Sequence, residues 1–337
     1  MSTTLITCDF GVDKDIDGKK SGYLRVPHST HLSAYGWIPV PITVVRNGEG
    51  PTVLMMAGVH GDEYEGQIAL DRLARKLTPE ALRGHLIILP AVNGPAAKAG
   101  LRTSPVDDGN LNRAFPGNAT GTPTQMIAHY IEEVLLPRCD YLVDLHSGGT
   151  SLYYPPTLLR GKGHTPEEAQ KLLELQQAFD LPYAWEFTSG GGPKSTARTA
   201  MGAANRKGVT SVMAELGGAG VVSKDILART ERGLRRILHW LGMLPGYKPD
   251  QARGTRVLHA EGSIYAYDIG LFEPYKDIGD PVNAGEEVGA IHFVDAPNRE
   301  PVTVDSPYSG IVLCKRTLGQ VACGDAVFQI ARDANQE

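Results

Sequence analysis

The chain has 337 residues and a formal net charge of −5, and 42% of its residues are hydrophobic. This length suits one large domain plus a smaller one, and the net charge gives no electrostatic sign of nucleic-acid binding, which would require a basic face. No apolar run approaches the ~20 residues that a membrane-spanning helix needs, and the N-terminus lacks the pattern of a signal peptide. We therefore expect a soluble, cytoplasmic protein with neither a nucleic-acid nor a membrane partner.

Residues 1–50 are turn-rich and predict short strands that lead into the core. Four apolar runs follow that are typical of strands buried on both faces, at 52–59, 85–92, 141–145 and 210–216. Segments with apolar residues at helical spacing accompany them, at 63–77, 124–136, 166–179, 196–207 and 223–244. This alternation predicts an α/β fold with a mainly parallel mixed sheet flanked by helices. In such a sheet, ligands bind beyond the carboxyl ends of the strands.

The composition of the sequence and the type of predicted element change near residue 245. PGYKPDQAR (245–253) is typical of a linker, and residues 254–332 hold short β-type segments separated by Gly, Pro and Asp. We predict a catalytic α/β domain over 1–245, with an N-terminal β extension, and a small all-β, sandwich-like domain over 254–332. The second domain resembles a lipoyl or biotinyl carrier. A carrier needs a modifiable Lys at an exposed hairpin tip, however, and the corresponding VDAPNREP has none, while Lys315 lies in a strand-like segment. A role in shielding the site or in forming a homo-oligomer is favoured instead.

Two of the predicted strands end in residues that bind metals. The first runs into GVHGDEYEG, which places His60 and Glu63 three residues apart at the start of a helix, where they share a face. The third runs into VDLHSGG, which places His146 at the same edge of the sheet. A single His after a strand is more often structural, but two His and one Glu form the ligand set of a catalytic zinc site. We predict one Zn²⁺ per chain, although cobalt or manganese would fit the same ligands.

Glu215 ends the apolar segment SVMAEL, the fourth predicted strand. A carboxylate in such a run is costly unless it is paired or functional. Two interpretations stay open: a buried structural ion pair, or a general base beside a metal-bound water.

A long polar loop, AGLRTSPVDDGNLNRAFPGN, lies between the second and third predicted strands. Loops of this length are usually functional or disordered. Arg113 suits a substrate carboxylate because its planar fork binds both oxygens, and Asn112 can donate a further hydrogen bond. Arg102 could polarise a scissile carbonyl. For an isolated loop Arg, a solvated cation is the alternative interpretation.

HGDE, NLNRAF, LHSGG and AEL occur here in an order that resembles the succinylglutamate desuccinylase/aspartoacylase family, relatives of the zinc carboxypeptidases. The resemblance covers roughly residues 50–245 and implies a zinc carboxypeptidase-like fold. It implies that His60, Glu63 and His146 bind zinc, that Glu215 is the general base and acid, that Asn112 and Arg113 hold the substrate carboxylate, and that Arg102 polarises the amide carbonyl.

A closer resemblance, carried by GYLRVPHSTHLSAYGWIPVPI, GDEYEGQIAL and RTSPVDDGNLNRAFPG, is to bacterial deacetylases of ectoine breakdown. It implies hydrolysis of N-alpha-acetyl-L-2,4-diaminobutyrate to acetate and L-2,4-diaminobutyrate. Asp107 and Asp108 are candidates for the substrate's free amine, with a solvated loop as the alternative. A deacylase for another N-acyl amino acid, a carboxypeptidase and a non-catalytic zinc protein remain competing hypotheses. Glu215 argues against the last, since a purely structural zinc site has no need of that carboxylate.

Overall fold

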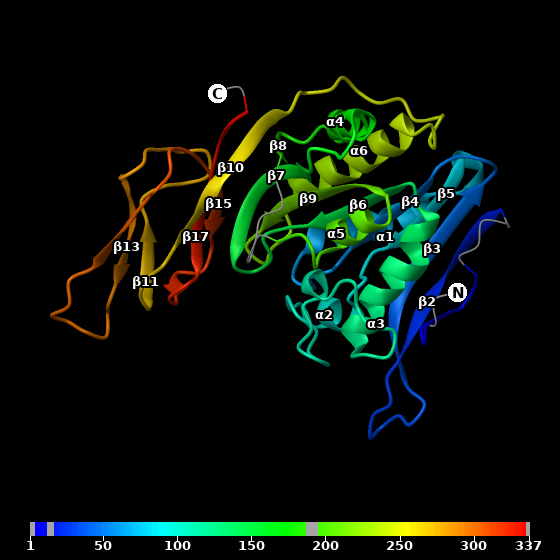
Figure 1. Cartoon of the computed structure of the whole chain (residues 1–337), viewed down its shortest axis with the longest axis horizontal. Helices are drawn as coiled ribbons and strands as arrows, with labels where there is room; N and C mark the ends of the chain where they lie inside the picture. Colours follow the sequence, from blue (N-terminus) through cyan, green and yellow to red (C-terminus); the bar gives the residue numbers. More distant parts are fainter. Residues whose placement is uncertain (1–3, 12–16, 187–194, 335–337) are drawn as a thin grey trace.

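The computed structural model describes residues 4–11, 17–186 and 195–334. Within these residues, thirteen strands form one large mixed sheet and four others form a smaller sheet (Figure 1). In order across the large sheet, the strands are β1 (Thr7–Cys8), β2 (Gly18–Pro27), β3 (Trp37–Asn47), β5 (Gly84–Leu89), β4 (Thr52–Ala57), β6 (Tyr141–His146), β9 (Thr210–Gly218), β7 (Leu152–Arg160), β8 (Tyr183–Glu186), β10 (Arg256–Tyr265), β17 (Ala326–Asp333), β15 (Gly310–Arg316) and β12 (Pro281–Val282). The smaller sheet contains β14 (Val302–Asp305), β13 (Glu287–His292), β11 (Gly270–Pro274) and β16 (Gln320–Val321).

Parallel pairing is concentrated in the middle of the large sheet. Strands β5, β4, β6 and β9, the four expected buried strands, run parallel to one another, and β8 is parallel to β7 and β10. The other neighbours are antiparallel. The expectation of a mainly parallel sheet therefore holds for the four central strands and for β8 with its two neighbours. Antiparallel pairing extends the sheet through β1, β2 and β3 on one side and through β17, β15 and β12 on the other.

Helices cover both faces of the central strands. Their bounds are α1 (Tyr64–Lys76), α2 (Gly94–Ala99), α3 (Pro123–Tyr130), α4 (Pro166–Phe179), α5 (Ala200–Arg206) and α6 (Lys224–Trp240), with 3-10 turns at Pro79–Ala81, Leu111–Arg113 and Leu136–Arg138 and a π-helical turn at Ile131–Leu135. One core lies between the sheet and α1, α4 and α6, and a second lies between the sheet and α3 and α5. The expected helix at 124–136 is thus α3 followed by a π-helical turn, and the one expected from 196 begins only at Ala200.

Alternation along the central strands decides which face each polar side chain meets. Val143 and Leu145 of β6 belong to the core beneath α1 and α6, and Ala214 and Leu216 of β9 belong to the same core. Successive side chains of a strand point to opposite faces. His146 and Glu215 therefore face the opposite side of the sheet, toward α3 and α5.

Strands β7 and β8 are absent from the sequence-based prediction. Pro155 and Pro156 lie inside β7, and proline lacks the N–H that a sheet ladder uses. The register against β9 is irregular between Tyr154 and Thr157, which accommodates the two prolines. At the N-terminus, β2 and β3 are longer than expected, with 10 and 11 residues.

The C-terminal β region, residues 256–333, contributes to both sheets. Strands β10, β15 and β17 extend the large sheet, while Phe272 and Phe328 pack within a separate core. VDAPNREP connects β13 to β14, and Lys315 lies in β15 and pairs with Asp277 at 2.8 Å. The division into domains at 245–254 stays a prediction.

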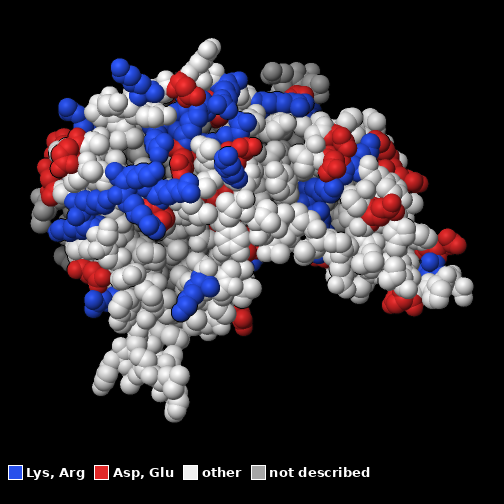
Figure 2. All heavy atoms as spheres, turned by 180° about the vertical axis from the view of Figure 1, so that it is seen from behind, with Lys and Arg blue, Asp and Glu red and all other residues white. Residues whose placement is uncertain are grey.

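Charged side chains of both signs are interspersed on the back of the molecule, and Lys and Arg gather over the larger part of it (Figure 2). Many form surface pairs, such as Arg72 of α1 with Glu231 of α6 at 2.8 Å. Each such pair contributes at most about 1 kcal/mol. In the described part of the chain, no helix is long and apolar enough to cross a membrane.

The packing of α4 on α6 gives a first prediction. Phe179, at the end of α4, is fully buried in the core beneath α1 and α6. Phe179→Ala should lower the free energy of unfolding by about 3–5 kcal/mol, because it removes a buried ring and leaves a cavity. Chemical denaturation of both proteins measures the change. Tyr35→Ala, at a side chain that is 99% exposed, should stay within about 0.5 kcal/mol of wild type, and an equal loss in both variants would contradict the assignment.

Candidate metal centre and catalytic site

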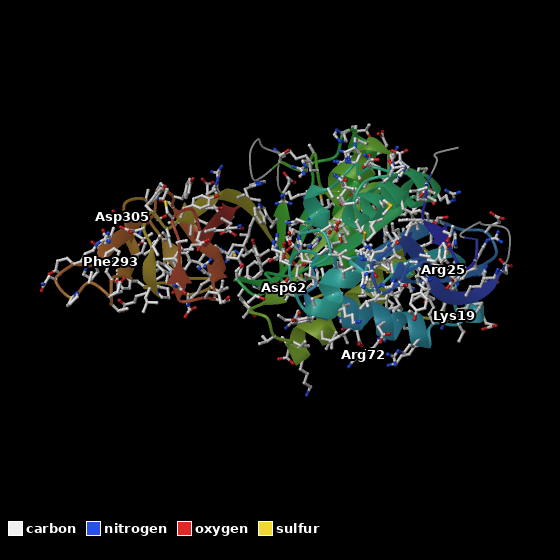
Figure 3. The ribbon with its side chains drawn as sticks, turned by 90° about the horizontal axis from the view of Figure 1, so that it is seen from below. Lys19, Arg25, Asp62, Arg72, Phe293 and Asp305 are labelled. Atoms are coloured by element: carbon white, nitrogen blue, oxygen red, sulfur yellow. The ribbon has the colours of Figure 1, made fainter. Side chains whose placement is uncertain are left out.

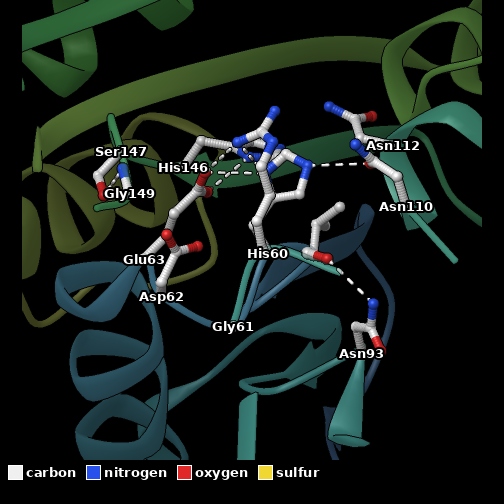
Figure 4. Close-up of polar contacts among 12 residues, drawn as sticks. His60, Gly61, Asp62, Glu63, Asn93, Asn110, Asn112, His146, Ser147 and Gly149 are labelled. Atoms are coloured by element: carbon white, nitrogen blue, oxygen red, sulfur yellow. Dashed lines mark hydrogen bonds and ion pairs between the residues drawn. The ribbon is translucent and has the colours of Figure 1, made fainter. Parts of the chain in front are cut away.

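Three buried side chains converge beyond the carboxyl ends of β4 and β6. His60 follows β4, Glu63 directly precedes α1, and His146 is the last residue of β6. Their candidate ligand atoms all lie within 4.8 Å of one another. The Nδ1 atom of His60 is 2.7 Å from Glu63 Oε1, and the Nδ1 atom of His146 is 2.8 Å from Glu63 Oε2 (Figure 4). The structure thus brings together the three residues predicted as metal ligands.

Each imidazole ring is also held from its other side. His146 Nε2 lies 3.0 Å from Asp144 Oδ2, and His60 Nε2 lies 3.1 Å from Asn110 Oδ1. Metal-binding histidines usually donate their second ring N–H to a carboxylate or carbonyl oxygen, which fixes the tautomer and the ring orientation. These contacts keep both Nδ1 atoms on the side of Glu63, so the donor set fits a catalytic zinc site.

The electrostatics of the three groups are mutually dependent. Burial by itself would raise the pKa of Glu63, but the charges of His60 and His146 and their hydrogen bonds outweigh it and lower that pKa. Burial would lower the pKa of His146, yet the carboxylates of Asp144 and Glu63 hold it well above the ordinary value. Glu63 is therefore a carboxylate throughout the neutral range, as a metal ligand must be.

The backbone of the HGDE turn packs too closely on α2 for a larger residue at Gly61. A Cβ atom there would lie 1.9 Å from the Ala96 carbonyl oxygen. The Gly61 N–H donates to the Leu101 carbonyl at 2.8 Å. Glycine therefore lets the turn carrying His60 and Glu63 dock against α2 and the loop that follows it.

Glu215 lies beside this cluster. It pairs in register with His146 across the parallel strands β9 and β6, so both side chains are on the same face of the sheet. The residue is half-buried, and its Oε2 is buried without a hydrogen-bond partner in the described part of the chain. Burial, and then the charge of Glu63, raise the pKa of Glu215 to about 8. A carboxyl group with such a pKa can accept and return a proton near neutral pH.

The three loop residues predicted to bind substrate differ in their contacts near the cluster. Arg102 lies beside it, with Nη1 at 3.5 Å from Glu63 Oε1 and 3.4 Å from His60 Nδ1. Asn112 is buried, and its Oδ1 accepts the Ala200 N–H at the start of α5 at 3.1 Å, which leaves Nδ2 as its donor. Arg113 donates to the Asn112 carbonyl at 2.7 Å. Burial, and then the charge of Arg102, lower the pKa of Arg113, so the two guanidinium groups lie near each other.

A third cation joins these two, and the sequence analysis did not single it out. The charge of Arg198 also lowers the pKa of Arg113, so Arg198 belongs to the same positive region. Arg198 lies far along the sequence from the polar loop that holds Arg102 and Arg113, so no local pattern indicates that it joins them. Asp107, a candidate for the substrate amine, instead accepts the Thr124 N–H and hydroxyl at 2.8 Å each. Asp108 is exposed.

Asp144 offers a test of the outer contacts. Asp144→Asn removes the carboxylate that holds His146 Nε2, so the affinity for zinc should fall by roughly 10- to 100-fold. Competition with a chelating dye measures the dissociation constant. Asp250→Asn changes an exposed carboxylate elsewhere and should leave the affinity unchanged. Wild-type affinity in Asp144→Asn would contradict the orienting role.

Comparisons with known proteins identify the chain as an amide-hydrolysing enzyme. Residues 49–241 match the succinylglutamate desuccinylase/aspartoacylase catalytic domain. N-alpha-acetyl-L-2,4-diaminobutyric acid deacetylase from Halomonas elongata is 37% identical, over 95% of this chain and 93% of that protein. The chain therefore belongs to the succinylglutamate desuccinylase/aspartoacylase family.

Solved structures extend the similarity over nearly the whole chain. The product-bound ectoine utilization protein EutE (DoeB) from Ruegeria pomeroyi has a TM-score of 0.92 and 36% identity, covering 98% of this chain and 100% of that one. A succinylglutamate desuccinylase/aspartoacylase from Rhodobacter sphaeroides has a TM-score of 0.90 and 38% identity, covering 97% and 99%. The large mixed sheet, its helices and the C-terminal β region are thus shared with these relatives, and the predicted family is confirmed.

Proposed function

We propose that the chain hydrolyses the amide of N-alpha-acetyl-L-2,4-diaminobutyrate to acetate and L-2,4-diaminobutyrate, in ectoine catabolism. The observation that carries this proposal is the buried cluster of His60, Glu63 and His146 with Glu215 beside it. The similarity to the Halomonas elongata deacetylase along most of both chains supports the choice of substrate.

His60, Glu63 and His146 would hold one zinc ion, because two imidazoles and a carboxylate suit zinc and both rings are held by outer contacts. When bound, zinc supplies a Lewis acid that polarises a carbonyl and lowers the pKa of water to about 7. We infer a zinc carboxypeptidase-like site at the carboxyl ends of the central strands.

The side chains around the cluster divide the remaining work. Glu215 takes the proton of the attacking water and then passes it to the departing amine, a task that suits its pKa of about 8. Arg102 donates to the oxyanion that develops on the acetyl carbonyl. Asn112, through Nδ2, and Arg113 bind the substrate carboxylate. These positions keep the scissile amide between Glu215 and Arg102.

The substrate class, the cellular compartment and the oligomeric state are part of the same proposal. The substrate is a small N-acyl amino acid, and we place the reaction in the cytoplasm. The chain works as a homo-oligomer, with the C-terminal β region shielding the site or contributing to assembly.

The test is acetate release by the zinc-loaded protein from N-alpha-acetyl-L-2,4-diaminobutyrate, beside N-acetylaspartate and N-succinylglutamate. We expect hydrolysis of the first substrate, loss of activity on zinc removal by a chelator, and recovery when zinc is restored. Zinc-dependent cleavage of another N-acyl amino acid alone would replace the substrate but keep the chemistry. Inactivity on all three would favour a non-catalytic zinc protein.

A further inference from the structure

The HGDE turn contains a buried carboxylate that takes no part in the metal cluster. Asp62 lies between the two predicted ligands of this turn in sequence and is only 5% exposed. Its Oδ2 accepts two hydrogen bonds from Thr150, one from the backbone N–H at 2.7 Å and one from the hydroxyl at 2.9 Å. Its Oδ1 is buried without a hydrogen-bond partner in the part of the chain that the structure describes. Burying a carboxylate costs folding free energy, so a function of Asp62 is needed to account for its position.

Thr150 belongs to the loop that follows His146. The two hydrogen bonds of Asp62 therefore join the segment carrying His60 and Glu63 to the segment carrying His146. In Figure 4, Asp62 lies next to Glu63 and faces the loop with Ser147 and Gly149.

The approach of the two segments at this point is close. A Cβ atom on Gly149 would lie 2.6 Å from Asp62 Oδ2, and Gly149 has a φ of +56°. Both conditions favour glycine. The second Gly of LHSGG is thereby explained by contact with Asp62.

The connection continues into the C-terminal β region. Thr317, directly after β15, donates its hydroxyl to the Thr150 carbonyl at 2.6 Å and its N–H to the Ser151 carbonyl at 2.9 Å. In Figure 3, Asp62 lies on the side of the larger part that is nearer to Phe293 and Asp305 of the C-terminal β region. Thr150 is thus held from both sides, by Asp62 and by Thr317.

We propose that Asp62 is a positioning residue, which sets the spacing of the two segments that carry the metal ligands, and that Thr317 supports the same loop from the C-terminal β region. This inference rests on the proposed metal site. Its physical basis is preorganisation: ligands bind a metal tightly only when their supporting contacts already hold them in place. Without the Asp62 carboxylate, the loop after His146 loses two hydrogen bonds to the HGDE turn.

The test compares zinc dissociation constants, measured by competition with a chelating dye, for wild type and variants along this chain of contacts. Asp62→Ala should raise the dissociation constant by roughly 10- to 100-fold. Thr150→Val, which removes only the hydroxyl donor, should raise it less, and Thr317→Val should act in the same direction. Thr150→Ser keeps the hydroxyl and should restore the wild-type value. Thr150 is exposed, so its variants should fold even if Asp62→Ala does not.

Asp180→Asn is the matched control. Asp180 is also buried, and it accepts hydrogen bonds from the Arg253 and Gly254 N–H groups and pairs with Arg232, all outside the metal site. It should lower the unfolding temperature and leave zinc affinity unchanged. Unchanged affinity in Thr150→Val and in any folded Asp62→Ala, or an equal loss in Asp180→Asn, would overturn the inference alone. Failure of the wild type to bind zinc would overturn the metal site and this inference with it.

Discussion

Glu215→Gln should reduce kcat on the proposed substrate by about 10²- to 10⁴-fold, the range that a general acid–base group contributes. The amide keeps the shape of the side chain but can neither accept the proton of the attacking water nor return it to the leaving amine. Stopped-time assays of acetate release, with the variant saturated with zinc, measure the loss. Glu215 is half-buried and its Oε2 has no hydrogen-bond partner among the described residues, so the substitution breaks no hydrogen bond of that atom within this part of the chain.

The control for this prediction is the metal content. Zinc should remain bound at one ion per chain in Glu215→Gln, since Glu215 is not one of the three proposed ligands. Activity within a few-fold of wild type would remove Glu215 from the proton-transfer role. Loss of zinc together with activity would instead make Glu215 a ligand.

His146→Ala should weaken zinc binding by more than roughly 100-fold, the largest loss expected when a residue that only orients a ligand is removed. Activity should disappear with the metal. The variant removes one of the three proposed ligands. It also leaves the carboxylates of Glu63 and Asp144 without the ring that lies between them. Two like charges in a buried site repel each other.

Equilibrium dialysis against buffered zinc measures this loss directly. His292→Ala is the control, because His292 pairs with Glu273 at 2.8 Å on the exposed surface of the smaller sheet. It should bind zinc as wild type does. Wild-type affinity in His146→Ala would exclude His146 as a ligand and, with it, the proposed centre.

The central strands and the site at their ends could be predicted because the signals are local. Strands buried on both faces leave continuous apolar runs, as in β4 and β9, and the carboxyl ends of parallel neighbours meet at one edge. His60 and His146 could therefore be brought together by reasoning from two strand ends. The roles assigned to them and to Glu215 stay predictions until metal binding and activity are measured.

The features that could not be predicted from the sequence depend on contacts between distant segments. The prolines of β7 mask a strand that exists because β9 and β8 pair with it. Arg198 reaches the positive region from a segment beyond the polar loop. The bond from Asp62 to Thr150 spans 88 positions along the chain, so no local pattern marks it.

The continuity of the large sheet has a consequence for how the molecule comes apart. Strand β10 is hydrogen-bonded to β8, and β15 is bonded to β7, so the C-terminal β region closes what would otherwise be an open edge of the catalytic sheet. Unpaired edges are templates for association between chains. A chain truncated after residue 253 should therefore expose the edge at β7 and β8. We expect such a fragment to associate through this edge and not to act as a smaller active enzyme. The 84 residues after position 253 thus cover an edge that would otherwise be free to pair with another chain.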